Sequence, residues 1–309
     1  MKFKGADILS TKLFARNDIE KVMRVAGRME PFASKRKLSD ILQGKILAAL
    51  FYEPSTRTRL SFETAMLRLG GRVITVPAME TSSLTKGETL FDTGKMVQNY
   101  ADVIAMRHPK EGSVTEMAEG ADISVINAGD GPGQHPTQAL LDMYTIRKEQ
   151  GKIDGLTIAM AGDLKFGRTV HSLCYLLAHY KVKLIFVSPK ELKMPVNVCE
   201  FLKKKGVKFS VESDFDKVIK SGVDVLYCTR IQKERFENEK EYLKLKGVFV
   251  LNKKKALTGK KTMTIMHALP RIDEIATDVD SLQNAAYFRQ ARNGVAVRMA
   301  LLALVLGKA

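Results

Sequence analysis

Short apolar runs alternate along this chain with segments in which apolar residues recur every three or four positions. The runs lie at residues 46–50, 73–76, 103–106, 124–127, 157–161, 184–187, 223–228 and 262–266. Runs of this length predict buried strands, and the recurring spacing of Phe62, Ala65, Met66 and Leu69 predicts an amphipathic helix. Continuous apolar strands that alternate with helices are typical of parallel sheets covered on both faces.

This alternation predicts an α/β protein of two domains, each a parallel sheet flanked by helices. The runs fall into two groups on either side of the polar segment 148–155. We therefore expect one domain over residues 1–148 and a second over 149–309, with a last helix from about Ala296 to Leu306 that can pack on either. Open parallel sheets bind ligands beyond the carboxyl ends of their strands. We therefore expect the active site just after the strands, in a cleft between the domains.

Composition narrows the class of protein. The 309 residues, 45% of them hydrophobic, suit two globular domains. No apolar run is long enough to span a bilayer and the first residues lack a signal-peptide core, so we expect no membrane association. Three widely spaced cysteines favour a reducing cytoplasm, and no Cys/His spacing predicts a metal site.

The formal net charge of +16 is compatible with nucleic acid or with anionic substrates. Much of it comes from lysine runs such as 203–205 and 253–255, which we interpret as solvated surface because lysine is seldom buried. No basic segment is interleaved with aromatic residues. The charge therefore favours anionic small-molecule substrates, and we expect no nucleic acid partner.

The segment "FYEPSTRTRLSFETA", residues 51–65, follows the first predicted strand. Ser55 is a suitable N-cap for the helix that begins there. The first helical turn would then hold Thr56, Arg57 and Thr58. Unpaired N–H groups, hydroxyls and a guanidinium at a helix N-terminus favour a phosphate group. For Arg59, one residue deeper, we expect an ion pair with a nearby carboxylate instead.

Other strand ends carry similar chemistry. Arg107 follows the third strand, and the Gly-rich turn after the fourth leads to His135, Pro136 and Gln138. Proline suits the first position of a helix, so His135 and Gln138 are expected at a helix start, facing a ligand.

The second half offers two isolated arginines, Arg168 and Arg230, and Gln232. The segment "GDLKFGRT" nearly matches a P-loop, but Arg168 stands where that motif needs lysine. Two separated arginines suit a molecule with two carboxylates. Leu269–Pro270, after the last strand, is a candidate cis peptide bond. Together the halves predict a phosphorylated substrate that reacts with a dicarboxylate.

Six motifs, "STRTR", "MRHP", "HPTQALLDMYTI", "GDLKFGRTVHS", "TRIQKER" and "HALPRIDE", resemble the signatures of the carbamoyltransferase family, specifically of its aspartate-specific catalytic chains. The resemblance extends in order from about residue 44 to about residue 300. It implies carbamoyl transfer from carbamoyl phosphate to L-aspartate, the committed step of pyrimidine biosynthesis, in the cytoplasm and without a cofactor. In that reaction the neutral amine of aspartate attacks the carbamoyl carbon. The tetrahedral oxyanion that forms needs hydrogen-bond donors in a site that holds little water.

The resemblance also implies roles for residues. The phosphate would be bound by Ser55, Thr56, Arg57, Thr58 and Arg107. The carbamoyl oxygen would be polarised by Arg107, His135 and Thr58. The carbamoyl nitrogen would be held by Gln138 and by the carbonyl of Leu269, in the segment Ala268-Leu269-Pro270. Arg168 would bind the α-carboxylate of aspartate, and Arg230, helped by Gln232, its side-chain carboxylate.

The polar loop "TSSLTKGETL" resembles the family's mobile loop, which would bring Ser82 and Lys86 into the site of a neighbouring subunit and implies a homotrimer with shared sites. Whether Ser82 or Ser83 faces the phosphate stays open. Ala268 stands where many aspartate enzymes have proline, and Thr85 where a second lysine is frequent. The resemblance leaves open whether a separate regulatory chain binds.

Three rival interpretations remain. An ornithine carbamoyltransferase would share the phosphate half, but its second substrate ends in an amine, for which Arg230 is unsuited. An NTP-driven or nucleic-acid-binding protein would account for "GDLKFGRT" and the charge of +16. An inactive scaffold would not be expected to keep the full set of arginines with His135.

Overall fold

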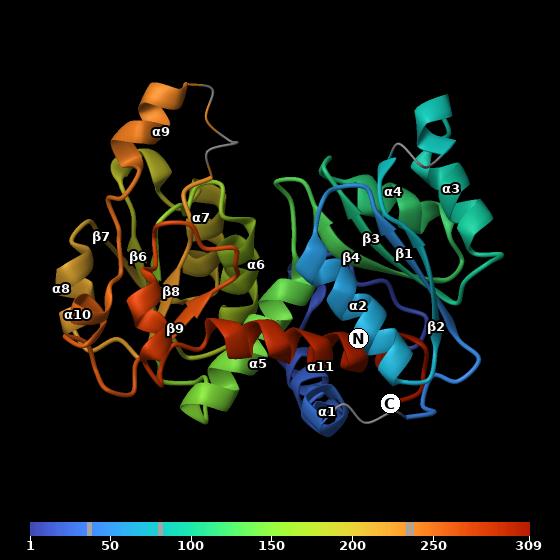
Figure 1. The fold of residues 1–309 in the computed structure, drawn as a ribbon, viewed down its shortest axis with the longest axis horizontal. Coiled ribbons are helices and arrows are strands. Elements are labelled where there is room, and N and C mark those ends of the chain that lie inside the picture. Colours follow the sequence, from blue (N-terminus) through green and yellow to red (C-terminus); the bar gives the residue numbers. More distant parts are fainter. Residues whose placement is uncertain (36–38, 80–82, 233–235, 237) are drawn as a thin grey trace. The chain divides into compact units, whose positions relative to one another are not determined.

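The computed structural model describes residues 1–35, 39–79, 83–232, 236 and 238–309. The chain forms two compact units, Met1–Tyr144 with Arg292–Ala309, and Thr145–Ala291. In the described part of the chain, each unit is built on one parallel sheet with helices packed on it, which confirms the predicted α/β class (Figure 1). No helix among these residues is both long and apolar enough to cross a membrane.

The first unit contains four parallel strands in the order β2-β1-β3-β4. They are β1 (Ile46–Phe51), β2 (Arg72–Val76), β3 (Val103–His108) and β4 (Ser124–Asp130). β4 is buried along its whole length, whereas β2 at the edge is largely exposed. The continuous apolar character of β1, β3 and β4 follows from burial of both faces of the sheet.

The helices of the first unit are η1 (Thr11–Leu13), α1 (Arg16–Lys35), α2 (Thr56–Arg68), η3 (Ser83–Lys86), α3 (Leu90–Val97), α4 (Ser113–Gly120) and parts of α5 (Pro136–Gln150) and α11 (Tyr287–Val305). Leu90 of α3 and Met117 of α4 pack on the sheet face formed by Ala48, Ile104 and Val125. Side chains alternate between the two faces of a strand, so the intervening residues of the same strands face the opposite side.

The second unit contains five parallel strands in the order β7-β6-β5-β8-β9. They are β5 (Thr157–Ala161), β6 (Lys183–Val187), β7 (Lys208–Glu212), β8 (Val225–Cys228) and β9 (Thr264–His267). The helices are α6 (Arg168–Leu177), η4 (Lys190–Leu192), α7 (Val196–Lys204), α8 (Phe215–Lys220), α9 (Glu239–Leu245), α10 (Lys253–Ala256) and η6 (Thr277–Ser281).

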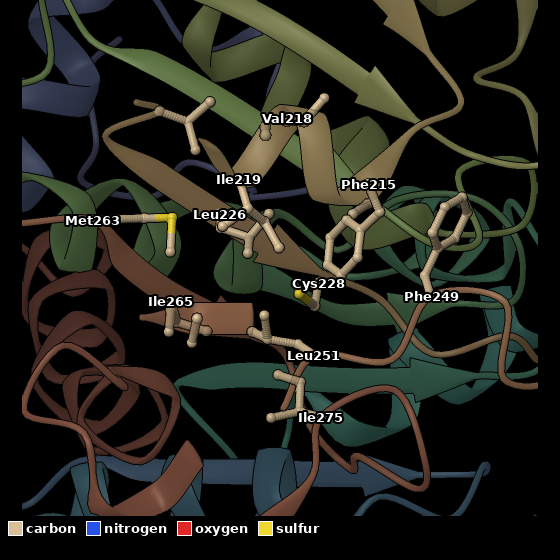
Figure 2. Close-up of a cluster of buried hydrophobic side chains, with 14 of the residues drawn as sticks. Phe215, Val218, Ile219, Leu226, Cys228, Phe249, Leu251, Met263, Ile265 and Ile275 are labelled. Atoms are coloured by element: carbon tan, nitrogen blue, oxygen red, sulfur yellow. The ribbon is translucent and has the colours of Figure 1, made fainter. Parts of the chain in front are cut away.

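One face of the second sheet carries a large apolar cluster (Figure 2). Leu226 and Cys228 of β8 and Ile265 of β9 lie against Phe215 and Ile219 of α8. On the other face, the thiol of Cys174 in α6 lies 3.7 Å from the sulfur of Met160 in β5. The sheet is therefore covered on both sides, as its apolar strands predict.

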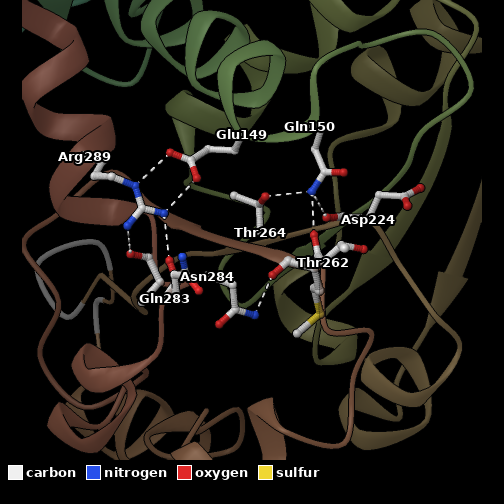
Figure 3. A network of polar contacts seen from close by, with 10 residues as sticks. Glu149, Gln150, Asp224, Thr262, Thr264, Gln283, Asn284 and Arg289 are labelled. Carbon is white, nitrogen blue, oxygen red and sulfur yellow. Dashed lines mark hydrogen bonds and ion pairs between the residues drawn. The ribbon is translucent and has the colours of Figure 1, made fainter.

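A polar network fixes the end of α5 to the second sheet (Figure 3). The side-chain amide of Gln150 donates to the carbonyls of Asp224 and Thr262 and to the hydroxyl of Thr264, at 2.7–2.9 Å. Beside it, the guanidinium of Arg289 pairs with both oxygens of Glu149, at 2.8 and 2.7 Å. Each of these donors satisfies acceptors that would otherwise lose water on folding.

Each predicted strand overlaps an observed one, but the structure corrects two expectations. β7 was not predicted, because it is an edge strand whose residues are exposed or half-buried and it contains no continuous apolar run. The last helix begins at Tyr287 instead of about Ala296. Its first turns contain Arg289, Arg292 and Gly294, which hide the helical pattern.

Candidate active site

The ends of three strands in the first unit lie side by side. Phe51 at the end of β1 is the register partner of Arg107 in β3, and the N–H of Tyr52 donates to the carbonyl of Arg107 at 2.9 Å. His108, the last residue of β3, is opposite Asp130 of β4. Helices α2 and α5 start after β1 and β4. The strand topology thus gathers the predicted phosphate-binding segments at one sheet edge.

The start of α2 differs in one respect from the prediction. Ser55 occupies the N-cap position, but its side chain makes no capping hydrogen bond, and its backbone has φ −159° and ψ 80°. That ψ is well below the extended value typical of a capping serine. The first N–H groups of a helix have no intrahelical partner, so those of α2 remain suited to an anion. Thr58 is buried in this turn, whereas Arg57 is exposed.

Two of the arginines pair with carboxylates. Arg59 Nε lies 3.8 Å from Glu63 Oε1, which confirms the ion pair expected for that residue. Arg107 Nε lies 3.0 Å from Glu53 Oε2. Glu53 was not predicted as part of the site. The signal was present, since Glu53 directly precedes "PSTRTR" in the chain, and a carboxylate there can hold the Arg107 guanidinium in a fixed orientation.

His135 and Gln138 are buried at the start of α5, 4% and 8% exposed. The carbonyl of His135 accepts from the N–H groups of Gln138 and Ala139, both at 3.1 Å, so His135 is fixed at the helix entry. The side-chain amide of Gln138 donates to Asp142 Oδ1, one turn later, at 2.8 Å. Asp142 is fully buried and was not predicted.

Arg298 of α11 is a second buried charged residue, and the charge of Asp142 acts on it. Burial lowers the pKa of Arg298 to about 10, and the negative charge of Asp142 opposes that decrease. Arg298 also donates to the hydroxyl of Thr137 at 3.4 Å and lies over the ring of Phe62, 5.2 Å from its centroid. The Gln138 side chain is therefore oriented by a buried carboxylate whose charge is partly balanced by that of Arg298.

His108 and Tyr52 are the neighbours of Arg107 at this sheet edge. Their rings meet edge to face with centroids 5.8 Å apart. Burial raises the pKa of Tyr52 to about 12, with a further contribution from Glu88. Burial lowers the pKa of His108, whose Nδ1 accepts the N–H of Lys110 at 3.0 Å. Both rings are therefore neutral near pH 7.

Lys86 ends the short helix η3 and is exposed to solvent. Leu84 of the same helix packs on the core of the first unit, which attaches this segment to the sheet. Ser82 lies outside the described residues.

In the second unit the ends of β5, β8 and β9 are adjacent, and Asp163 joins the first two. Its Oδ1 accepts the N–H of Phe166 at 2.9 Å, and its Oδ2 accepts the N–H of Gln232 at 3.4 Å. Asp163 is fully buried, and burial raises its pKa against the opposing effects of those N–H groups and of the Arg230 charge. This carboxylate was not predicted; it fixes both loops that carry the candidate aspartate-binding residues.

The "GDLKFGRT" loop does not have the chemistry of a P-loop. In a P-loop the backbone N–H groups hold phosphate oxygens, but here Asp163 already accepts one of them, from Phe166. Gly162 has φ +114°, and a Cβ there would overlap the carbonyl of Thr229. The glycine therefore serves close contact between the β5 and β8 ends, and the NTP-binding interpretation loses its support.

Arg168 is the first residue of α6, half-buried, with its N–H donating to the carbonyl of Phe166 at 2.9 Å. Arg230 and Gln232 follow β8 and are half-buried too. Ala268 and Leu269 are half-buried and Pro270 is exposed, after β9. The Leu269–Pro270 bond is cis, as predicted. The fold thus brings the candidate residues that follow β5, β8 and β9 to one end of the second sheet.

Comparison with known proteins identifies the family of both parts of the chain. Residues 6–148 match the family model of the aspartate/ornithine carbamoyltransferase carbamoyl-P binding domain, and residues 154–305 match that of its Asp/Orn binding domain. The chain is 53% identical over 307 residues, 99% of each chain, to the aspartate carbamoyltransferase catalytic subunit of Thermococcus kodakarensis.

Two solved structures are also similar over nearly the whole chain. One is the catalytic subunit of M. jannaschii aspartate transcarbamoylase, 49% identical, with a TM-score of 0.91 and 99% and 98% of the two chains covered. The other is the Trypanosoma cruzi aspartate transcarbamoylase in complex with carbamoyl phosphate and aspartate, 42% identical, with a TM-score of 0.92 and 98% of each covered. Two family models that together match most of its length show that the chain belongs to the aspartate/ornithine carbamoyltransferase family.

Proposed function

We propose that this chain is an aspartate carbamoyltransferase, which transfers the carbamoyl group of carbamoyl phosphate to L-aspartate and releases phosphate. The observation that carries the proposal is end-to-end similarity, at about half of all positions, to relatives named aspartate carbamoyltransferase catalytic subunit. A similar solved enzyme binds carbamoyl phosphate together with aspartate. The reaction is the committed step of pyrimidine biosynthesis, and we place it in the cytoplasm.

In this proposal the first unit binds carbamoyl phosphate. Ser55, Thr56, Arg57 and Thr58, with Arg107, hold the phosphate at the start of α2. The uncapped helix N-terminus supports this role, because its N–H groups and positive dipole end favour an anion. Gln138, whose amide is oriented by Asp142, and the carbonyl of Leu269 hold the carbamoyl nitrogen.

The second unit binds aspartate in this proposal. Arg168 takes the α-carboxylate, and Arg230, with Gln232, takes the side-chain carboxylate. Attachment of both loops to Asp163 supports a fixed arrangement of these groups. A guanidinium can hold a carboxylate through two parallel hydrogen bonds. Ornithine carries an amine at the corresponding end, so Arg230 favours aspartate.

The proposed chemistry is acyl transfer. The neutral amine of aspartate attacks the carbamoyl carbon, and the developing oxyanion accepts hydrogen bonds from Arg107, His135 and Thr58. Burial of His135 and Thr58 supports this role, since such donors act most strongly where water is excluded. Phosphate leaves and takes the amine proton on its own oxygen, so His135 acts as a donor and no strong protein base is needed.

We assign carbamoyl phosphate binding to residues 1–148 and aspartate binding to residues 149–309. The matched family models, over 6–148 and 154–305, support this division. The compact units divide differently, because the end of α11 from Arg292 onward belongs with the first unit.

We further propose a homotrimer in which Lys86 and Ser82 reach the site of a neighbouring copy. The exposed position of Lys86 supports it. So does a set of large apolar side chains on the first unit that are 43–57% exposed: Leu60, Leu67, Ile74, Phe91, Met96 and Tyr100. Exposed apolar side chains mark sites of association where they gather into one patch.

Mixing experiments test the shared sites. Lys86→Ala chains and Arg57→Ala chains are dissociated, mixed and reassembled. If Lys86 acts in a neighbour's site, some hybrid sites collect both substitutions and others neither, so activity returns. A mixture as inactive as its parents contradicts sharing.

The activity itself is tested with the purified chain, carbamoyl phosphate and either aspartate or ornithine, with and without EDTA. We expect N-carbamoyl-L-aspartate and phosphate in equal amounts, unaffected by EDTA. Turnover of ornithine but not aspartate, or loss of activity with EDTA, contradicts the proposal.

A further inference from the structure

The turn after β9 contains a strained residue. Leu269 has φ +57°, and it is the one non-glycine residue with a positive φ in the described part of the chain. A leucine side chain disfavours this conformation, so neighbouring groups must hold it. The N–H of Leu269 donates to Nδ1 of His267, two residues earlier, at 2.8 Å.

His267 uses both ring nitrogens. Its Nε2 lies 2.6 Å from Oε1 of Glu274. Because Nδ1 accepts the Leu269 N–H, it carries no proton, and the ring proton lies on Nε2, the nitrogen that contacts Glu274. The two contacts therefore fix one tautomer and one orientation of the imidazole.

Glu274 is itself anchored. Its other oxygen, Oε2, accepts the N–H groups of Ile272 and Asp273, both at 3.2 Å. Its carbonyl accepts the N–H of Leu251 at 2.9 Å. The backbone of His267 is fixed as well, since its N–H donates to the side chain of Gln290 at 2.9 Å. The turn is thus tied to two other segments of the second unit.

Burial makes this arrangement costly as a source of stability alone. His267 and Glu274 are 3% and 6% exposed. Buried pairs of this kind are often no better for stability than apolar residues of the same volume. The pair instead orients the turn, because it holds the N–H of a strained residue just after β9.

We propose that His267 and Glu274 are positioning residues for carbamoyl transfer, which hold the Ala268–Pro270 turn so that the Leu269 carbonyl meets the carbamoyl nitrogen. This inference rests on the proposed function, which places that carbonyl against the substrate. It adds two residues that act through the turn without touching substrate.

Two matched substitutions separate the two contacts of the ring. In His267→Asn the amide oxygen stands near the position of Nδ1 and can accept the Leu269 N–H, but Glu274 is out of reach. In His267→Gln the amide nitrogen stands near the position of Nε2 and can donate to Glu274, but the Leu269 N–H loses its acceptor. Both remove a buried ring, so both lower the melting temperature.

Catalysis should distinguish the two variants where stability does not. A displaced contact in an active site costs up to about 100-fold in rate, so we expect kcat to fall roughly 10- to 100-fold in His267→Gln and about threefold or less in His267→Asn. The KM for aspartate should change little in either. Equal kcat values, or a kcat that follows melting temperature alone, would show a merely structural pair.

An NMR measurement tests the tautomer directly. The chain has five histidines, so ¹⁵N-histidine labelling gives a simple spectrum. We expect the His267 proton on Nε2 in the native protein and a changed tautomer in Glu274→Gln, whose amide presents a donor to Nε2. A proton on Nδ1 in the native protein contradicts the inference. If the unsubstituted chain forms no carbamoyl aspartate, the proposed function fails instead, whatever the tautomer.

Discussion

The opposite buried charges of Asp142, which accepts from Gln138, and Arg298 give a prediction with a calculable size. Burial lowers the pKa of Arg298 to about 10 from an ordinary value above 12. At about 1.4 kcal/mol for each tenfold change in equilibrium, roughly 3 kcal/mol opposes the charged form even beside Asp142. Asp142 is 0% and Arg298 3% exposed, so water offers little compensation.

Removing one partner should therefore be far worse than removing both. Arg298→Met leaves the Asp142 carboxylate buried without the opposing charge of Arg298, and we expect a loss of about 3–5 kcal/mol in the free energy of unfolding. The double variant Asp142→Leu/Arg298→Met should recover at least about 2 kcal/mol of that loss, because apolar residues of similar volume often replace two opposite buried charges without cost.

Carbamoyl phosphate affinity should instead be lower in the double variant than in Arg298→Met. The double variant removes the acceptor of the Gln138 amide, so we expect its affinity to fall about tenfold, the effect of one lost hydrogen bond. Urea unfolding at one protein concentration and equilibrium binding measure the two properties. A double variant as unstable as Arg298→Met, or one that binds normally, would refute the reasoning.

Two further predictions concern the second unit. Gly162→Ala should lower the free energy of unfolding by about 2 kcal/mol or more, because φ is +114° and the added Cβ meets the Thr229 carbonyl. A urea unfolding curve within error of that of the native chain contradicts this. Burial alone would raise the pKa of Glu274, but the contact with the His267 ring and the backbone N–H groups outweigh it and lower that pKa. The stability that Glu274 contributes is therefore present above the unfolded value of about pH 4.3 and is lost as pH falls through the lower folded value. The difference in unfolding free energy between native chain and Glu274→Gln should narrow below that pH, and a constant difference from pH 7 to pH 3 contradicts it.

The fold was predictable from the sequence wherever strands are buried on both faces. β1, β3 and β5 read as continuous apolar runs, because helices cover both sides of their sheets. β7 contains Lys208 and Glu212 at its ends and has no buried residue, so periodicity did not reveal it. An edge strand such as β7 forms because it pairs with a neighbouring strand, here β6. A local sequence pattern contains no information about that pairing.

The candidate site was predictable only as far as its anion-binding side chains. Arginines and hydroxyls at strand ends carry a chemical signal in the sequence itself. Asp163 does not, because it acts on a partner that only folding brings close, Gln232, 69 positions later in the chain. Arg298 lies still farther from Thr137, 161 positions away. Such supporting contacts follow from topology, which motifs do not encode.

The central claim is that one set of residues binds carbamoyl phosphate and another reads the second carboxylate of aspartate. Equilibrium binding of carbamoyl phosphate to Arg230→Ala and Arg57→Ala, beside aspartate kinetics, tests it most directly. Losing a guanidinium from a buried carboxylate costs roughly 2–5 kcal/mol, so Arg230→Ala should need far more aspartate for saturation and turn over slowly while binding carbamoyl phosphate almost normally. Arg57→Ala should weaken carbamoyl phosphate first. If Arg230→Ala loses carbamoyl phosphate affinity as severely as Arg57→Ala does, the division of the two substrates between these residues is wrong.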